Sequence, residues 1–427
     1  MMHRIRRSLD KGRGVVQSSS DTNSVQIKEV GTSAILGERP QQEDRFIALL
    51  PGSLKSNKDI ALFGVFDGHA GSTVSDHLRE NIAGFIDEAL SKTSEHSQEA
   101  YKSAIQDALD RADAIVDQKD WRDGSTLVLV LIDTSQRILI EADLGDSHMV
   151  FAEHTRRNKK EESKLNKLDH TLRAHHLAKS KNEWSIRRLS VPHDPESPSE
   201  RKRIEDAGGE VKFDTGAARI GALAMTRAIG DTELKLPRVN NLAGHNLTDL
   251  DGVETGLQPG KKASADLVIN KAHFSVQHLT GESLLFLSTD GIGEKKDAEL
   301  AARTATDWKR QGWSAKQIAN ELAKRAGKAK GSDNCTVIVV SLEAPDATKF
   351  EQSLQSTERK EEKEQKGAAS LKTIDAEPWH DSKKGSELHA YKSMDELDRQ
   401  NAKKRENLER NRALRWIDCV FQGISHG

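Results

Sequence analysis

The stretch Ala61-Leu-Phe-Gly-Val-Phe-Asp67-Gly68-His69-Ala-Gly71 decides how the rest of the chain is interpreted. An apolar run of strand length ends at an aspartate, which glycine and histidine follow at once. The end of a strand is a rigid support, and glycine lets a metal or substrate approach the backbone closely. Aspartate supplies a hard oxygen ligand, and histidine can donate a proton near neutral pH. Because Asp-Gly-His alone also fits a hairpin turn, the other motifs must decide between turn and site.

The composition limits the class of protein. The chain has 427 residues, a formal net charge of −2 and two distant cysteines, Cys335 and Cys419. The length allows one large or two ordinary domains, the charge gives no case for nucleic acid as a partner, and the cysteines predict no disulfide framework. No run approaches the about 18 apolar residues of a membrane span, so we expect no integral membrane segment. With 31% charged residues and a mean hydropathy of −0.68, part of the chain should be solvated.

Four parts are expected along the chain: a flexible basic leader over 1–25, a folded domain over 26–343, a charged linker over 344–400 and an amphipathic helix over 401–427. The leader lacks the apolar core of a secretory signal, which leaves a disordered tail or an organelle transit peptide. We therefore expect the cytoplasm or nucleus as the compartment, or the mitochondrion if the leader is a transit peptide. The C-terminal helix could pack on the domain or dock on a partner or a membrane surface.

Apolar runs and helical spacing alternate within 26–343. Strands are expected over 33–36, 61–66, 125–133, 138–144, 283–288 and 335–342, and helices over 73–90, 97–116 and 304–326. The polar stretch 153–189 interrupts this pattern and is interpreted as an inserted surface excursion. Strands and helices interspersed around one core predict an α+β domain.

Acidic residues occur at strand ends and turns in four separate segments. They are Glu43 with Asp44, Asp67, Asp290 and Asp333. Three of these segments abut apolar strands, where unpaired carboxylates would be costly and a divalent metal would offset the cost. Oxygen ligands without His or Cys ligand spacing favour Mg²⁺ or Mn²⁺ over zinc. Arg39 can bind phosphate through its planar guanidinium and His69 could protonate a leaving oxygen, so the residues alone indicate metal-dependent phosphoester chemistry.

The ordered motifs resemble those of the metal-dependent protein serine/threonine phosphatases of the protein phosphatase 2C type. The resemblance covers about 26–342 and rests on Arg39-x-x-x-Glu43-Asp44-Arg45, Phe63-Gly-Val-Phe-Asp67-Gly68-His69-Ala-Gly71, Asp123-Gly-Ser125-Thr126, Ala142-Asp-Leu-Gly145-Asp146-Ser147, Arg203-Ile-Glu-Asp-Ala-Gly208-Gly209, Leu223-Ala-Met-Thr226-Arg227-Ala-Ile-Gly230-Asp231, Asp290-Gly291 and Asp333-Asn334. It implies two packed antiparallel β-sheets flanked by helices on both sides. It also implies phosphoprotein substrates, and we expect a monomer.

The resemblance assigns a role to each matching residue. Asp67 would bridge two Mn²⁺ or Mg²⁺ ions, Glu43 and the carbonyl of Gly68 would hold one, and Asp290 and Asp333 would hold the other. Asp44 would orient the metal-bound water that acts as nucleophile. Arg39 would bind the substrate phosphate, and His69 would be the general acid.

Two departures from the family pattern leave a third metal site open. Pro192 stands where the family has an acid, and either Asp194 or the pair Asp169-His170 could substitute for it. Glu294 stands where the family tends to have aspartate. A regulatory pseudophosphatase, or a metallohydrolase acting on small phosphoesters, remains the alternative function.

Other charged residues in the matching motifs are expected to be structural. Asp146 and Asp231 follow glycines in sharp turns, where aspartate bonds nearby backbone. Arg219 and Arg227 are interpreted as ion-pair partners without a catalytic role.

Overall fold

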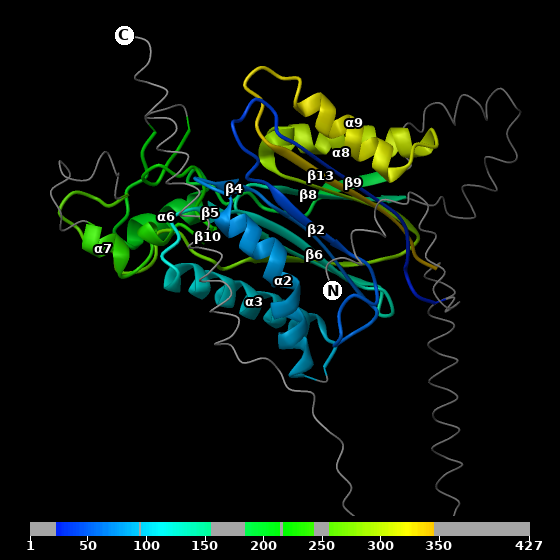
Figure 1. The fold of residues 1–427 in the computed structure, drawn as a ribbon, viewed down its shortest axis with the longest axis horizontal. Helices are drawn as coiled ribbons and strands as arrows, with labels where there is room; N and C mark the ends of the chain where they lie inside the picture. The colour runs from blue at the N-terminus through cyan, green and yellow to red at the C-terminus, as the bar shows by residue number, and fades with distance from the viewer. Residues whose placement is uncertain (1–22, 94, 155–183, 214–216, 243–255, 346–427) are drawn as a thin grey trace, which may run out of the picture. The chain divides into compact units, whose positions relative to one another are not determined.

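Two antiparallel sheets form the centre of the computed structural model, which describes residues 23–345 except 94, 155–183, 214–216 and 243–255. The first sheet has the order β1 (Gln26–Ile35), β13 (Cys335–Glu343), β12 (Glu282–Ser288), β8 (His148–His154) and β9 (Trp184–Arg188). The second has the order β11 (His273–His278), β7 (Ile138–Leu144), β6 (Leu127–Asp133), β3 (Ile60–Phe66) and β2 (Arg45–Leu49). Helices α8 (Lys295–Arg310) and α9 (Ala315–Ala326) cover the first sheet, and α2 (Thr73–Ser91) and α3 (Gln98–Gln118) cover the second (Figure 1). The expected α+β sandwich is confirmed.

Side-chain alternation along the strands separates three apolar layers. Phe63 of β3 and Val130 of β6 pack with Phe151, Leu285 and Val340 of the first sheet to form the core between the sheets. The neighbouring residues on β3 and β6 point the other way and pack against α2 and α3. Strands buried on both faces are expected to be nearly continuous apolar runs, and β3 and β6 are.

The helical region expected over 304–326 consists of two helices, the end of α8 and the whole of α9, with a break between them. Gly312 adopts a φ of +88°, a left-handed conformation that favours glycine and ends a helix. The side chain of Ser314 then caps α9 by accepting a hydrogen bond from the Gln317 N–H at 3.3 Å. Trp308 stacks on Trp313 with ring centroids 4.8 Å apart, which fixes the bend between the helices.

The polar excursion expected over 153–189 is wrong at both ends. Glu153 and His154 complete β8, and 184–188 form β9, which pairs with β8 in the register Glu153↔Ser185. The central part, 155–183, lies outside the described residues, as do 1–22 and 346–427 with the expected linker and C-terminal helix. The leader ends earlier than expected, since Val25 is 4% exposed and belongs to the core between the sheets. None of the described helices combines the length and apolarity needed to cross a membrane.

A third, smaller sheet brings distant segments together beside the sandwich. It consists of β4 (Gly68–His69), β5 (Gly124–Ser125) and β10 (Ile229–Gly230), in the order β10-β5-β4. Helices α6 (Pro198–Asp206) and α7 (Arg238–Leu242) lie on the same side of the molecule (Figure 1). Because Gly124 pairs with both His69 and Gly230, the residues after Gly230 come next to His69.

Candidate active site

Hydrogen bonds join three of the four predicted acidic segments, and a neighbouring strand positions the remaining one. The backbone N–H of Glu43 donates to Oδ1 of Asn334 at 2.7 Å, which connects the first segment to the fourth. The Thr289 hydroxyl donates to Oδ2 of Asp44 at 2.9 Å, which connects the third segment to the first. Asp67, at the end of β3, is placed by its carbonyl, which accepts a hydrogen bond from the Thr126 N–H at 2.9 Å.

Gly68 packs directly against the backbone of Glu43. A Cβ atom at position 68 would lie 2.6 Å from the Glu43 carbonyl oxygen and 2.8 Å from the Ser75 hydroxyl. That hydroxyl donates to the same carbonyl at 2.5 Å. Only glycine therefore fits between Asp67 and His69, because the backbones at positions 68 and 43 approach each other too closely for a side chain.

Like charges gather around Asp67. Desolvation raises the pKa of Asp67 well above its ordinary value, and the negative charges of Asp290 and Asp44 raise it further. Desolvation raises the pKa of Asp44 to about 6, although the hydroxyl groups of Thr336 and Thr289 lower it. Desolvation and Asp290 raise the pKa of Asp146 to about 7. Carboxylates that share one poorly solvated site raise one another's pKa values in this way.

Two oxygen atoms in this cluster lack hydrogen-bond partners. Oδ1 of Asp44 and Oδ1 of Asp146 are buried, and neither has a partner among the described residues. Unpartnered carboxylate oxygens beside other carboxylates are the donor set that hard divalent cations prefer. The residues present therefore fit the Mn²⁺ or Mg²⁺ ions that the sequence indicates.

The predicted ligands are not drawn into one tight group. Where the chain is described, only one set of three acidic or histidine side chains has all its ligand atoms within 4.8 Å of one another, and that set is Glu141, Asp143 and His273. Sequence reasoning did not single out these three residues.

Arg39 lies at the exposed rim of the cluster. Its Nη2 atom is 2.5 Å from Oδ2 of Asp333, so the predicted phosphate-binding cation is paired with a predicted metal ligand. Gln41 donates to Oε1 of Glu43 at 2.9 Å. The ion pair with Asp333 holds the guanidinium beside the carboxylates while it remains open to solvent.

His69 contacts an aspartate that was expected to bond backbone. Its Nε2 atom is 2.8 Å from Oδ1 and 2.9 Å from Oδ2 of Asp231, whereas its Nδ1 atom is buried without a partner in the described part of the chain. Burial lowers the pKa of His69, but the nearby charge of Asp231, helped by Asp146 and Asp123, outweighs burial and leaves that pKa raised. The motif Gly230-Asp231 signalled a turn, and nothing in its spacing signalled this pair.

The residues that could have rebuilt a third metal site are used elsewhere or lie outside the described part. Oδ1 of Asp194 accepts a hydrogen bond from the Ser197 N–H at 2.8 Å, just before α6. The side chain of Glu294 is 81% exposed and lies 3.5 Å from Lys296. Asp169 and His170 fall outside the described residues.

The expected ion pair of Arg227 is present. Its Nη2 atom is 2.5 Å from Oε1 of Glu200. Arg219 donates to the carbonyl of Ala222 at 2.5 Å. Both contacts are structural.

Comparison with known proteins adds independent findings. The sequence model of the family described as protein phosphatase 2C matches residues 28–335. The chain is 26% identical over 344 residues to the rice (Oryza sativa subsp. japonica) probable protein phosphatase 2C 68, covering 74% of this chain and 79% of the relative. It is 25% identical over 366 residues to protein phosphatase 2C 37 of Arabidopsis thaliana, covering 79% of each. The crystal structure of a serine-threonine phosphatase 2C from Toxoplasma gondii shares the fold, with a TM-score of 0.52, 20% identity, and coverage of 74% of this chain and 94% of that one.

Proposed function

Because the chain belongs to the protein phosphatase 2C family and is a serine/threonine protein phosphatase, we propose that it hydrolyses phosphoserine and phosphothreonine at the acidic cluster around Asp67. The observation that carries this proposal is the convergence of carboxylates with unpartnered buried oxygens next to a cation and an imidazole. No observation in the described residues favours a pseudophosphatase, since every predicted site residue is present.

The cluster would hold two Mn²⁺ or Mg²⁺ ions. Asp67 would be shared between them, with Glu43 and the Gly68 carbonyl on one side and Asp290 and Asp333 on the other. When bound, such ions supply Lewis acidity that makes water a better nucleophile and offsets the charge of the phosphate. Asp44, whose Oδ2 already accepts a hydrogen bond from Thr289, would orient that water through its unpartnered Oδ1.

Arg39 and His69 would act on the substrate itself. Arg39 can turn from Asp333 to the phosphate, because a guanidinium binds two phosphate oxygens at once. The protonated imidazole of His69 would donate its proton to the departing serine or threonine oxygen. Asp231 would support this role by stabilising the charged imidazole.

The proposal is tested with the purified full chain and a phosphothreonine peptide. We expect phosphate release in millimolar Mn²⁺, loss of release on addition of EDTA, and recovery when excess Mn²⁺ is restored. The Asp67→Asn variant, purified in the same way, controls for a contaminating phosphatase. Absence of release by the wild-type chain in Mn²⁺ and in Mg²⁺ would refute the proposed activity.

A further inference from the structure

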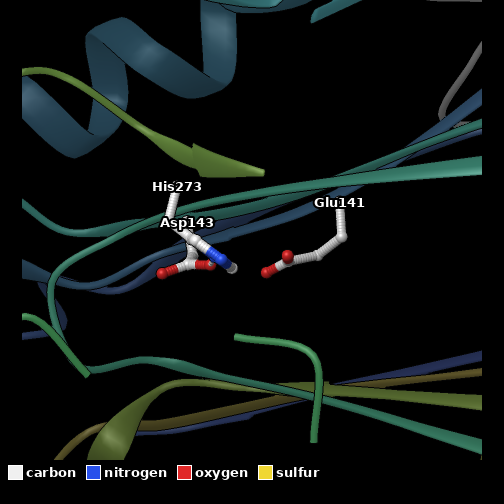
Figure 2. Close-up of side chains that lie close together, drawn as sticks. All are labelled: Glu141, Asp143 and His273. Atoms are coloured by element: carbon white, nitrogen blue, oxygen red, sulfur yellow. Dashed lines mark hydrogen bonds and ion pairs between the residues drawn. The ribbon is translucent and has the colours of Figure 1, made fainter. Parts of the chain in front are cut away.

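A second group of ligand-type side chains lies away from the cluster around Asp67. Glu141 and Asp143 belong to β7, and His273 on the neighbouring strand β11 pairs directly with Asp143. Figure 2 shows the three side chains pointing toward one another. The ring Nδ1 of His273 is 2.9 Å from Oδ1 of Asp143, and each residue offers a ligand atom within 4.8 Å of the others.

The two carboxylates face the core between the sheets. On β7, Ile140 and Ala142 pack toward the helices, whereas Leu139 belongs to the core between the sheets. Glu141 and Asp143 share the alternation of Leu139 and therefore point inward. They are 0% and 1% exposed, so two acidic groups occupy positions where an apolar residue is expected.

Glu141 has no partner in the described structure. Neither of its carboxylate oxygens accepts a hydrogen bond from an N–H or hydroxyl donor among these residues, and no cationic side chain there forms an ion pair with it; its neighbour is the carboxyl group of Asp143. Arg188 is the nearby cation, but its Nε donates to the Ser190 hydroxyl at 3.0 Å, and its Nη1 is itself buried without a partner. Burial of an unpaired carboxylate is costly, so the group must take up either a proton or a cation.

Asp143 lies near the charge of Arg188 and accepts a hydrogen bond from the Val191 N–H at 3.3 Å, but no arginine or lysine among the described residues forms an ion pair with it. His193 places its Nδ1 3.4 Å from Oδ2 of Asp143, but that nitrogen accepts a hydrogen bond from the Gly145 N–H at 3.3 Å and so has no proton to donate. Burial lowers the pKa of His193 to about 4, which keeps its ring neutral. His273, 35% exposed on the edge strand, is the imidazole that completes the group and opens it to solvent.

We propose that Glu141, Asp143 and His273 form a binding site for a divalent transition-metal ion, for which zinc is the appropriate probe. One imidazole with two carboxylates suits zinc and its neighbours in the first transition row, whereas Mg²⁺ and Ca²⁺ prefer oxygen ligands alone. The site shares no residue with the acidic cluster around Asp67. A bound ion would join the edge strand β11 to β7 just before Gly145 and Asp146.

The experiment measures zinc in a full-length background that carries Asp67→Asn and Asp290→Asn, so that the acidic cluster contributes little. The protein is stripped with EDTA, incubated with Zn²⁺ in excess Mg²⁺, passed through a desalting column and analysed for zinc. We expect close to one zinc ion per chain, and loss of that ion in His273→Gln. His278→Gln, an exposed histidine on the same strand, is the matched control and should keep the zinc.

Thermal unfolding supplies the second readout. Zinc should raise the unfolding midpoint of the background protein and of His278→Gln by several degrees, and leave that of His273→Gln unchanged. Circular dichroism checks that each variant is folded, and because His273 is partly exposed its replacement does not open the core. Equal zinc content in the two histidine variants, or no retained zinc in the background protein, would overturn the proposal. A Glu141→Gln variant that becomes more stable with no zinc dependence would show instead that Glu141 carries a proton.

Discussion

The Nε2 atom of His69 lies 2.8 Å from Oδ1 and 2.9 Å from Oδ2 of Asp231, a residue 162 positions later in the chain. Strand β5 makes this contact possible, because Gly124 pairs with His69 on one side and Gly230 on the other. Although burial lowers the pKa of His69, the carboxylate of Asp231 leads the groups that raise it above the ordinary value. The imidazole therefore keeps its proton to higher pH than a free histidine would.

Replacing Asp231 by asparagine should narrow the pH range of activity. The variant lowers the pKa of His69, so the proton needed by the leaving oxygen is lost at lower pH. We expect the basic limb of the profile of kcat/KM against pH to move to lower pH, and kcat/KM at pH 8 to fall about tenfold. That loss is part of the roughly 10²–10⁴-fold that general acid catalysis contributes. Phosphopeptide hydrolysis in saturating Mn²⁺ measures the profile.

Glu233→Gln is the matched control for this prediction. Glu233 lies two residues after Asp231 and forms an ion pair with Arg122 near the surface. Its replacement removes the same charge at almost the same position without touching His69, and the profile should stay in place. If the Asp231→Asn profile coincided with that of Glu233→Gln, Asp231 would have no influence on the proton donor.

Gly124→Ala should disrupt the contact between His69 and Asp231 through a steric clash. A Cβ atom at position 124 would contact both Nε2 of His69 and Oδ2 of Asp231 too closely for either to stay in place. We expect kcat to fall about 10²-fold, the lower end of a general acid's contribution, with a small change in KM. Steady-state kinetics on a variant shown to be folded by circular dichroism test this expectation.

The control glycine is Gly84 in α2. A Cβ atom there would meet nothing within 4 Å, and alanine is favoured over glycine inside a helix by about 0.5–1 kcal/mol. Gly84→Ala should therefore raise the free energy of unfolding by about that amount and leave kcat unchanged. Similar kinetics for the two alanine variants would contradict the steric argument.

Most strands buried on both faces could be predicted from the sequence, although β8 was missed, whereas the edge strands β9 and β11 could not. The bounds of β7, 138–144, match the expectation, because every residue of β7 is buried and the apolar run is nearly continuous. Strands β9 and β11 were missed because they lie at sheet edges and read Trp-Ser-Ile-Arg-Arg and His-Phe-Ser-Val-Gln-His. Partial burial gives such strands no apolar run to detect.

In the candidate site, too, residues marked by a local sequence pattern could be predicted, whereas contacts between segments far apart in the sequence could not. Asp67, Asp290 and Asp333 could be proposed because each adjoins an apolar strand in sequence. The contact between His69 and Asp231 depends on strands of two residues, which carry no periodicity. Pairings of this kind are tertiary, and a single sequence contains no local signal for them.

Asp67→Asn should affect activity and stability in opposite directions. Loss of the negative charge of the shared ligand should reduce kcat about 10³-fold or more, since several kcal/mol of charge stabilisation act at such a centre. Without metal, however, the variant removes a carboxylate whose pKa desolvation and like charges raise, so its unfolding midpoint in EDTA should exceed that of the wild type. Phosphate release and thermal unfolding in EDTA measure the two effects.

Asp59→Asn, at the exposed residue just before the same strand β3, is the control for Asp67. It should change neither quantity appreciably. A near-wild-type rate for Asp67→Asn would refute its role as a shared ligand. A lower midpoint in EDTA would show that the cluster is held together without metal.

Glu200 should make stability depend on pH below the neutral range. Despite burial, which raises its pKa, hydrogen bonds from Arg227 and Thr226 and the charge of Arg203 lower the pKa of Glu200 to about 2. A carboxyl group whose pKa is depressed by folding stabilises the protein above its unfolded pKa and loses that contribution as pH falls toward the folded value. The contribution should thus be complete at pH 7 and decline between about pH 4.5 and about pH 2.

Glu200→Gln tests this dependence by urea unfolding at pH 7, 4 and 2.5. We expect a loss of about 3 kcal/mol at pH 7, because two arginines would lose a buried partner, and a smaller difference from wild type at each lower pH. Glu205→Gln on the same helix removes an exposed pair with Arg201 at 2.8 Å and should cost less than about 1 kcal/mol at every pH. Equal losses for the two variants, or a difference at Glu200 that stays constant with pH, would mean that the network around Arg227 does not depend on the charge of Glu200.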